Sequence, residues 1–254
     1  MKNNKIYCKS IYQICFFYCI IEPYNKNESE EYMNNIDDLI KKRHSVRKYQ
    51  DKEIEQKKVE ELNKLIDNIN KENNLHLQLV LNDSSPFDKF ILHYGKLDAK
   101  NYLAMIGPSD KKLDEKIGYY GEKIVLKATE LGLNTCWVSG TFSKRNVKAK
   151  IDNNEKLPCI IAIGYGTSNG VERGSKTFSD VSLSKSTPEW YKKGIEYALL
   201  APTAMNEQKF KFELINDSTV RATPGTGIGN TKLDLGIAKY HFELGAGIDN
   251  FKWE

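Results

Sequence analysis

Two short segments, far apart in the 254-residue chain, carry side chains suited to an anionic ligand that also forms hydrogen bonds. In the first, Arg43, Ser45 and Arg47 alternate, so their side chains can converge from an extended or turn segment. Two guanidinium groups and a hydroxyl suit a phosphate monoester. Because lysines flank this motif and charge runs are usually solvated, spacing alone favours a basic surface patch or a nucleic-acid contact.

The second segment, residues 202–208 (PTAMNEQ), follows a helical pattern and leads into a strand pattern. Thr203, Asn206 and Gln208 should therefore lie in a loop beside a sheet. Their hydroxyl and amide groups can bind the polar edge of a heterocycle or a polyol chain. Taken alone, the segment is better explained by turn chemistry, in which Thr and Asn side chains bind their own backbone.

The composition is that of an ordinary globular protein with enough apolar residues for a sizeable core: 40% of the residues are hydrophobic and 28% charged. A net charge of +4 is too small to indicate a dedicated nucleic-acid binder. Three of the five cysteines fall in the first twenty residues, and no Cys/His spacing matches a zinc site. We therefore predict no disulfide framework, no metal site and a reducing, cytoplasmic setting.

Residues 1–32 differ from the rest of the chain. Residues 11–21 form an apolar run behind three lysines, as in a secretion signal, but the run is too short to span a bilayer and no small-residue cleavage site follows. A signal peptide and an interfacial anchor stay open as alternatives. We predict that residues 1–32 are a loosely attached extension and that the protein has no membrane partner. Because Met33 lies just before the first convincing helix, the natural start could be at Met33, with residues 1–32 translated from upstream sequence.

The remaining hydrophobic periodicity predicts mixed helices and strands, an α+β fold with helices on a sheet. A serine-rich stretch, residues 179–187, is predicted as a surface connector, with Thr187 capping the next helix. The predicted helices begin at Ile36 and run over 59–69, 114–131, 188–200 and 233–244; the predicted strands are 75–81, 102–106, 135–138, 159–163, 210–214 and 220–223.

The order of these elements repeats. Alignment of the two long helices matches Ile124 with Ile237 and the tripeptide 130–132 with 243–245, both Glu-Leu-Gly. This weak but ordered match indicates an internal duplication. We predict a first half over residues 33–178 and a shorter second half over 179–254.

Four motifs in this order resemble the nitroreductase family, more closely its single-chain, internally duplicated "putative TM nitroreductase" group. The resemblance runs from about Met33 to the C-terminus. It implies a nitroreductase-like fold with a mixed or antiparallel sheet flanked by helices, folded as a pseudo-dimer from two degenerate halves. The motifs are RHSVRKY (43–49), GYYGEK (118–123), LGLNTCW (131–137) and ALLAPTAMN (198–206).

The resemblance also implies an FMN site. By analogy with relatives, the first motif holds the FMN phosphate and ring edge, a loop from the other half reaches the flavin, and a backbone amide after residues 136–138 lies near flavin N5. A basic cluster before the final connector completes the phosphate site, although Gly174-Ser175 there replaces a more basic pattern. The residues implied are Arg43, His44, Ser45, Arg47, Ser139, Gly140, Arg173, Lys176, Pro202, Thr203, Ala204 and Asn206.

Each half lacks one family motif. No Pro-x-x-x-Asn loop follows the first basic motif, and no Arg-x-Ser-x-Arg opens the second half. The resemblance therefore implies one flavin per chain and a monomer that acts as a pseudo-dimer. The implied activity is hydride transfer from NADH or NADPH through flavin N5 to a nitroaromatic, quinone or similar small-molecule acceptor, without nucleic acid. A flavin-binding or flavin-sensing protein without turnover is the alternative, and a basic interaction module is a third.

Other chemical motifs are less suited to function. The glycines of residues 225–229 miss the spacing of a dinucleotide-binding loop and predict a turn. The four histidines show no metal or triad spacing. Cys136 reads as a buried apolar residue rather than a nucleophile. The three tryptophans are predicted to pack in the core or at the interface between the halves.

Overall fold

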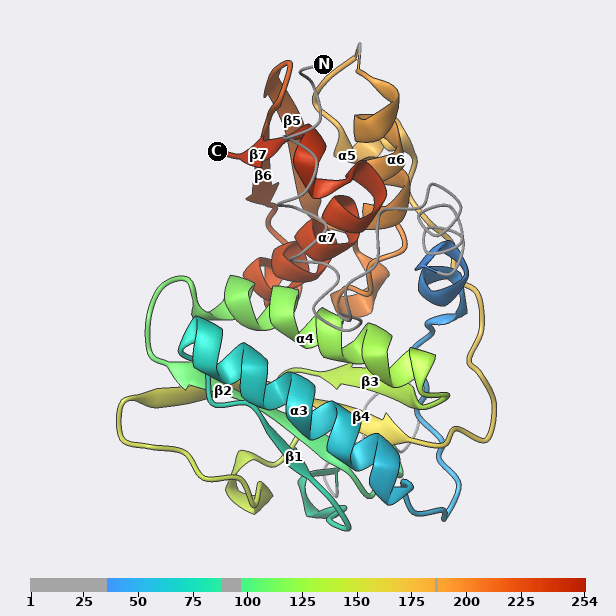
Figure 1. The fold of residues 1–254 in the computed structure, drawn as a ribbon, viewed down its shortest axis with the longest axis vertical. Helices are drawn as coiled ribbons and strands as arrows, with labels where there is room; N and C mark the ends of the chain where they lie inside the picture. Colours follow the sequence, from blue (N-terminus) through green and yellow to red (C-terminus); the bar gives the residue numbers. More distant parts are fainter. Residues whose placement is uncertain (1–35, 88–96, 186) are drawn as a thin grey trace, which may run out of the picture.

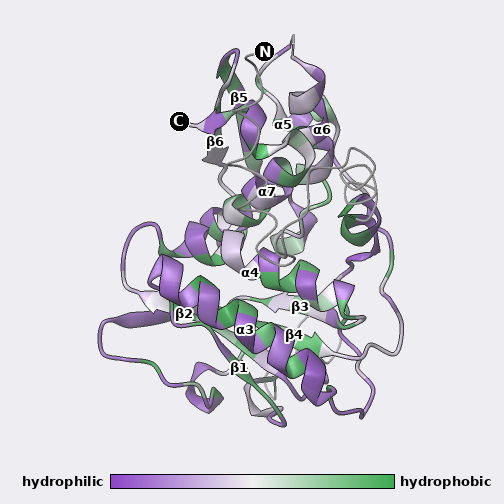
Figure 2. Ribbon diagram, viewed as in Figure 1, coloured by the Kyte–Doolittle hydropathy of each residue, from purple (hydrophilic) through white to green (hydrophobic). Residues whose placement is uncertain are grey.

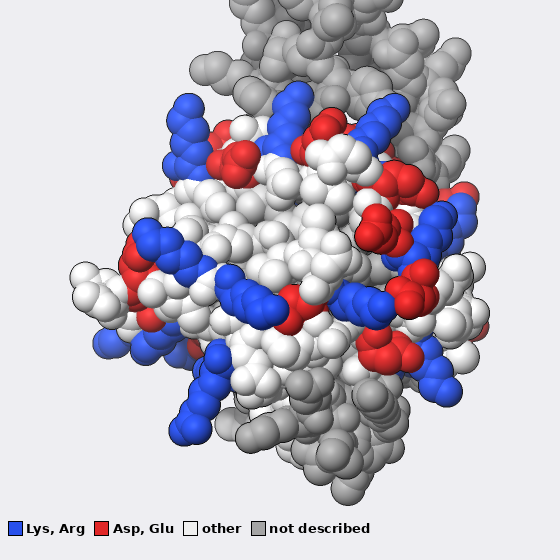
Figure 3. Space-filling model, turned by 90° about the horizontal axis from the view of Figure 1, so that it is seen from below, with Lys and Arg blue, Asp and Glu red and all other residues white. Residues whose placement is uncertain are grey.

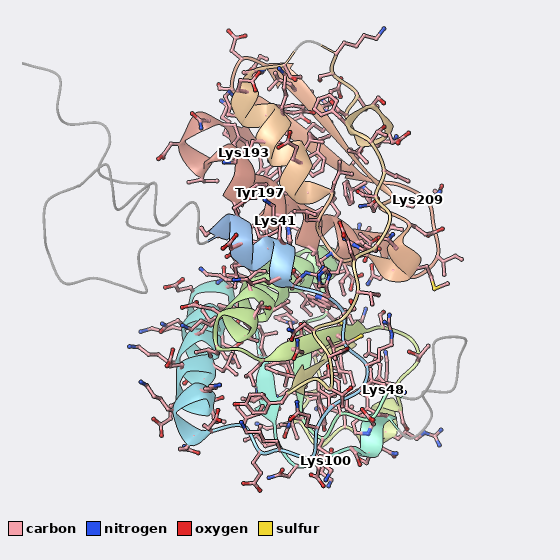
Figure 4. The ribbon with its side chains drawn as sticks, turned by 90° about the vertical axis from the view of Figure 1, so that its right-hand side faces the viewer. Lys41, Lys48, Lys100, Lys193, Tyr197 and Lys209 are labelled. Atoms are coloured by element: carbon pink, nitrogen blue, oxygen red, sulfur yellow. The ribbon has the colours of Figure 1, made fainter. Side chains whose placement is uncertain are left out.

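The computed structural model describes residues 36–87, 97–185 and 187–254. The predicted extension, residues 1–32, lies outside these ranges. Residues 36–42 form the predicted first helix. Its apolar side chains Ile36 and Ile40 pack with Leu126 and Tyr197. In Figure 4, Lys41 on this helix lies beside Tyr197, so the start of the described chain contacts the second half of the sequence.

The larger sheet has four antiparallel strands in the order β1-β2-β4-β3 among the described residues. Its two middle strands are almost wholly buried, because α3 and α4 cover one face (Figure 1) and a second apolar cluster around Phe87 and Phe142 covers the other. The elements are α3 (Gln56–Asn73), β1 (Gln78–Val80), β2 (Tyr102–Pro108), α4 (Leu113–Glu130), β3 (Asn134–Val138) and β4 (Glu155–Gly164), with short 3-10 turns at Ser85–Phe87 and Lys144–Asn146.

Helix α3 is amphipathic in the manner its sequence predicts. Its buried side chains recur at helical spacing and face the sheet, whereas lysines, glutamates and asparagines face outward (Figure 2). The face of the molecule seen in Figure 3 mixes basic and acidic side chains, with no continuous basic surface among the described residues there. None of the helices in the described part of the chain is long and apolar enough to cross a membrane.

The second half builds a smaller sheet in the order β5-β6-β7, in which β5 and β6 are antiparallel and β7 is parallel to β6. Its core is aromatic: Phe212 stacks on Phe242, which also contacts Phe251 and Trp253. The elements are α5 (Phe178–Val181), α6 (Glu189–Ala198), β5 (Phe210–Asn216), β6 (Thr219–Pro224), α7 (Thr231–Ala246) and β7 (Lys252–Trp253), with 3-10 turns at Ala204–Asn206 and Ile248–Asn250.

Helices α4 and α7 join the two halves, and a glycine on each permits the close approach. A Cβ atom on Gly118 would lie 2.0 Å from the Leu233 carbonyl oxygen, and one on Gly236 would lie 2.0 Å from the Glu115 carbonyl oxygen. The two contacts are reciprocal, which is the pattern of an approximate two-fold axis at the crossing. They relate Gly118 to Gly236, a register five residues away from the sequence match of Ile124 with Ile237.

The structure confirms the α+β class and the order helix-strand-strand-helix in each half. Three local predictions are wrong. Residues 179–187 are not a plain connector, because α5, which begins at Phe178 behind a capping box at Thr177, continues into them as far as Val181, and Ser182 pairs with Phe212. Pro188, not Thr187, takes the N-cap position of α6. The strand predicted over 75–81 is regular only over β1. Leu75 and Leu77, which precede β1 in the chain, are buried in the core without forming part of the strand.

Candidate functional site

The first basic motif lies along β3, the edge strand of the larger sheet. Ser45 forms a parallel bridge with Thr135, and the Val46 amide donates to the Thr135 carbonyl at 2.9 Å. Tyr49 then pairs with Gly166, beyond the end of β4. The motif is therefore extended, as its alternating pattern predicts, and it is fixed by backbone pairing to the sheet.

The segment just after α6 lies opposite this motif, and arginines from the first half bind its carbonyl groups. Arg43 Nη2 donates to the Leu200 carbonyl at 3.4 Å, and Arg173 Nη2 donates to the Ala201 carbonyl at 2.5 Å. A helix C-terminus also carries partial negative charge, so two guanidinium groups placed just beyond α6 are electrostatically favourable. The second-half loop is thereby attached to the first-half motif.

Residues 170–176, here called the connecting segment, join the motif to the loop. Gly170 lies against His44, since a Cβ atom there would be 2.6 Å from His44 Cβ. Arg173 Nη1 donates to Asn206 Oδ1 at 2.5 Å, and Asn206 Nδ2 donates to the Gly174 carbonyl at 2.8 Å. The predicted residues of both halves thus meet in one place.

Lys176 and Gln208 fix the other end of the connecting segment. The Lys176 amide donates to Gln208 Oε1 at 2.7 Å, and Lys176 Nζ donates to the Gln208 carbonyl at 3.2 Å. Gln208 Nε2 in turn donates to the Leu199 carbonyl at 2.7 Å, and the Gln208 amide donates to Thr203 Oγ1 at 3.0 Å. Part of the amide and hydroxyl chemistry of this loop therefore serves its own conformation, as the turn interpretation predicts.

The loop holds three non-glycine residues in the left-handed region: φ is 54° at Met205, 56° at Asn206 and 48° at Gln208. Such a conformation costs free energy at each residue and persists where surrounding contacts enforce it. Here the enforcing contacts are those of the connecting segment, together with the Ala204 amide, which donates to both carboxylate oxygens of Asp234 at 3.1 Å. Pro202 is buried beneath the loop.

A buried charge network lies behind the site. Arg43, 5% exposed, has its Nε 3.6 Å from Glu122 Oε1 on α4. The same carboxylate accepts from His241 Nε2 of α7 and from Trp137 Nε1 of β3, each at 2.9 Å. Although burial alone would raise the pKa of Glu122, the hydrogen bond from His241 and the charge of Arg43 hold this pKa below its ordinary value.

The network leaves an excess of positive charge. Burial lowers the pKa of His241, while the hydrogen bonds of its two ring nitrogens, to Glu122 Oε1 at 2.9 Å and to the Tyr197 carbonyl at 3.1 Å, act in the opposite direction. Burial and the neighbouring Arg43 lower the pKa of Arg173 to about 10, a value at which its guanidinium stays charged at neutral pH. Two guanidinium groups therefore face one buried carboxylate, and Arg43 Nε has no hydrogen-bond partner in the structure.

Other predicted residues lie farther along β3. Ser139 and Gly140 follow its last residue and are exposed. Gly140 has a φ of 84°, and no heavy atom lies within 4 Å of the place where its Cβ would be. A planar group could approach this backbone closely. Arg47 stays on the motif side, near the Cys136 thiol, whose pKa is raised by burial and lowered in part by this arginine.

Comparison with known proteins identifies the family to which this chain belongs. The family model described as "Putative TM nitroreductase" matches residues 35–246. The chain belongs to this nitroreductase family. Among solved structures, a "putative nitroreductase" from Thermotoga maritima is 22% identical over 82% of this chain and 81% of its own, with a TM-score of 0.57, and has the same fold. No curated protein sequence matches.

Weaker structural matches carry related descriptions. A "putative nitroreductase in complex with FMN" from Desulfovibrio desulfuricans is 18% identical over 60% of this chain and 98% of its own, with a TM-score of 0.48. A "Putative NADH dehydrogenase/NAD(P)H nitroreductase" from Bacteroides thetaiotaomicron is 21% identical over 58% of this chain and 96% of its own, with a TM-score of 0.46.

Sequence reasoning about this nitroreductase-family chain missed Glu122 and His241. Both lie within helices whose apolar spacing predicts core positions, and a buried pair there follows only from the crossing of α4 and α7. The single signal was the placement of a glutamate and a histidine on otherwise apolar faces. It also missed one possible metal-ligand group among the described residues, His76 with Asp152 and Glu155, which lies at the far end of the sheet.

Proposed function

We propose that this protein is an FMN-dependent oxidoreductase of nitroreductase type that binds one flavin per chain. The observation that carries the proposal is the uncompensated positive charge where the two halves meet. Arg43 and Arg173 share one buried carboxylate, Glu122, so an anion would complete the charge balance. A phosphate monoester supplies that charge together with the acceptor oxygens that guanidinium groups bind best.

The residues present fit such a group, with roles that differ in part from those the resemblance implies. Arg43 is turned inward to Glu122, so its part is to add positive potential from behind the site. Arg173, His44 and Ser45 are partly exposed around the same place and would contact the phosphate, with Arg47 and Lys176 at either side. Charge-assisted hydrogen bonds of this kind contribute about 1.5–3 kcal/mol each.

The opposite end of the site would hold the ring. Residues 203–206 and the Gly140 backbone belong to different halves, and the open space at Gly140 suits a planar group. When bound, FMN would supply the capacity to accept hydride from NADH or NADPH and pass it to a nitroaromatic, quinone or similar acceptor. The chain's own task is to bind and orient the cofactor and to keep the loop in its left-handed conformation.

The halves differ in a way that supports one site. The loop between α3 and β1 spans residues 74–77, whereas the loop between α6 and β5 spans residues 199–209. Only the longer loop reaches the arginines described above. A monomer that carries both components would need no second subunit to complete the site.

The decisive experiment measures FMN per chain by absorbance after saturation and gel filtration, and then adds NADH or NADPH without oxygen. We expect one FMN per chain and bleaching of the flavin band. Bound FMN that neither nucleotide reduces would instead identify a flavin-binding protein without turnover. Absence of FMN binding would refute the proposal.

Two arginine variants test the phosphate contacts. Arg173→Ala should weaken FMN binding about 10- to 100-fold, because it removes one charge-assisted contact. Arg47→Ala should give colourless protein on purification. Arg145→Ala removes an exposed arginine of the same sheet-bearing half and serves as the matched control, with unchanged affinity. Equal affinity in all three variants would contradict the assignment.

A further inference from the structure

A second site lies at the opposite end of the larger sheet from the residues just described. His76 precedes β1, and Asp152 and Glu155 flank the turn that opens β4; each offers a ligand atom, and these atoms all lie within 4.8 Å of one another. The candidate flavin site adjoins the other end of β4. Because a strand rises about 3.3 Å per residue, Ile163, which pairs with Thr135 beside Ser45, lies roughly 26 Å along β4 from Glu155, whereas Ile160, which pairs with Val138 before Gly140, lies roughly 16 Å from it.

From this group we propose that the chain binds a divalent transition-metal ion, with Zn²⁺ as the reference ion. One imidazole and two carboxylates are a ligand set that zinc accepts, with water completing four-fold coordination. His76 Nδ1 already lies 2.9 and 3.1 Å from the Glu155 carboxylate oxygens. Ligand atoms around tetrahedral zinc stand about 3.4 Å apart, so a small opening of this contact admits the ion.

The backbone around the three ligands is well fixed. The His76 amide donates to the Ile106 carbonyl of β2 at 2.9 Å, and the Glu155 amide donates to the Asp152 carbonyl at 2.9 Å. The Asp152 amide donates to Glu155 Oε2 at 2.9 Å, which orients that carboxylate. Hydrogen bonds that orient ligands in this way raise metal affinity, because less order is lost on binding.

A side-chain bridge ties the two ligand-bearing segments together. Gln78 of β1 donates to the Lys150 carbonyl at 2.7 Å and accepts from the Lys150 amide at 3.0 Å. The exposed fractions of the side chains are 31% for His76, 15% for Glu155 and 57% for Asp152, so an ion can reach them from solvent. The site is therefore both preorganised and accessible.

Lys150 supplies a sharp prediction. Its Nζ lies 3.2 Å from Asp152 Oδ1, and the side chain is 75% exposed. This ammonium group competes with a metal ion for the same carboxylate, but it can swing into solvent when an ion arrives. Lys150→Ala should therefore tighten metal binding several-fold, an effect that random surface binding would not show.

The experiment is equilibrium dialysis of the full chain, loaded with flavin if it binds flavin, against Zn²⁺, with Co²⁺ absorption as a second signal. We expect one saturable ion per chain, affinity lowered at least about tenfold in His76→Ala and in Glu155→Gln, and raised in Lys150→Ala. Asp51→Asn, which removes a carboxylate of another exposed ion pair, is the matched control and should bind as the parent does.

Two results would overturn the proposal: no saturable binding at sub-millimolar Zn²⁺, or equal affinity in His76→Ala and the Asp51→Asn control. Metal-free thermal melts of every variant verify that each is folded. His76→Asp guards against loss through misfolding, because exchange of the imidazole for an oxygen ligand should lower the affinity for Co²⁺ more than the affinity for Mn²⁺. Since the site shares no residue with the candidate flavin site, failure here leaves the flavin proposal untouched.

Discussion

Glu122 on α4 and Glu243 on α7 make similar hydrogen bonds near the crossing of the two helices. Each accepts a hydrogen bond from the tryptophan of the strand that follows its own helix: Trp137 Nε1 lies 2.9 Å from Glu122 Oε2, and Trp253 Nε1 lies 2.6 Å from Glu243 Oε1. Each also accepts one from the opposite helix, from His241 and Tyr119 respectively. The similarity is one of contacts and not of register, because the crossing that relates Gly118 to Gly236 relates Glu122 to Tyr240.

The two carboxyl groups differ in charge environment. Glu122 is fully buried and faces Arg43, which helps to keep its pKa low. Glu243 is partly exposed, and burial raises its pKa in spite of the hydrogen bonds from Trp253 and Tyr119. Only the Glu122 position is continuous with the arginines of the candidate flavin site. The two ends of the α4–α7 crossing therefore differ, and the buried charges lie at the Glu122 end.

Replacement of each glutamate by glutamine tests this difference most strongly. Glu122→Gln leaves the buried Arg43 guanidinium without a charged partner and should lower the free energy of unfolding by about 3–5 kcal/mol. Glu243→Gln should cost clearly less, because its partners are neutral groups and partly exposed ones. Urea unfolding of the flavin-free proteins measures both.

Equal losses in the two variants would show that Arg43 is not what makes the first position critical. A double variant that also changes Arg43 to methionine provides the control. It removes the unpaired charge together with its partner and should recover part of the stability that Glu122→Gln loses.

The first turns of α4 and α7 also differ, because the acidic residue of α7, Asp234, is buried. Burial raises the pKa of Asp234 from 3.8 to about 7. The hydrogen bond from the Ala204 amide acts against this rise, and the charge of Glu207 adds to it. The folded protein therefore binds this proton more tightly than the unfolded chain. Its contribution to stability is fully present below about pH 4 and is lost as the pH rises through 7, by up to about 4 kcal/mol.

Asp234→Asn should accordingly raise stability at pH 8 and flatten the decline between pH 4 and 7, because the amide oxygen still accepts from Ala204. Thermal unfolding across this pH range measures the effect. Asp114→Asn removes an acidic residue from the first turn of α4 and should keep the decline, since Asp234 is still present. A parent protein without any such decline would contradict the assignment.

The reciprocal glycines predict a symmetric effect. Gly118→Ala and Gly236→Ala each place a methyl group against a carbonyl oxygen of the facing helix and should each cost about 1–3 kcal/mol. Gly174→Ala is the matched control, since no heavy atom lies within 4 Å of its Cβ position. Strongly unequal costs at the two glycines, measured by urea unfolding, would argue against a two-fold crossing.

The sequence predicted more of the fold than of the site. Short apolar runs located β2 and β4, and helical spacing located α4 and α7, because burial leaves a local pattern in the sequence. The inward turn of Arg43 left no such pattern, since it depends on Glu122, a residue 79 positions away. The left-handed turn at 205–208 was equally hidden, because Met and Gln rarely adopt that conformation and only the connecting segment enforces it.

The left-handed turn at 205–208 gives the prediction with the smallest expected effect, a comparison of the short α3–β1 loop with the long α6–β5 loop. The α3–β1 connection needs one left-handed residue, Asn74, and asparagine tolerates that conformation. The α6–β5 loop instead places Met205, which is 52% exposed, in the left-handed region. Met205→Gly relieves the steric cost but gives the unfolded chain more freedom, so the gain in stability should be below about 1 kcal/mol. If the Met205 conformation serves the flavin, the same variant should bind FMN more weakly while it unfolds no more easily. Asn74→Gly, in the α3–β1 loop, is the control: it should change stability by a similar amount and leave FMN affinity unchanged. A loss of FMN affinity in both variants would contradict a special role for the α6–β5 loop.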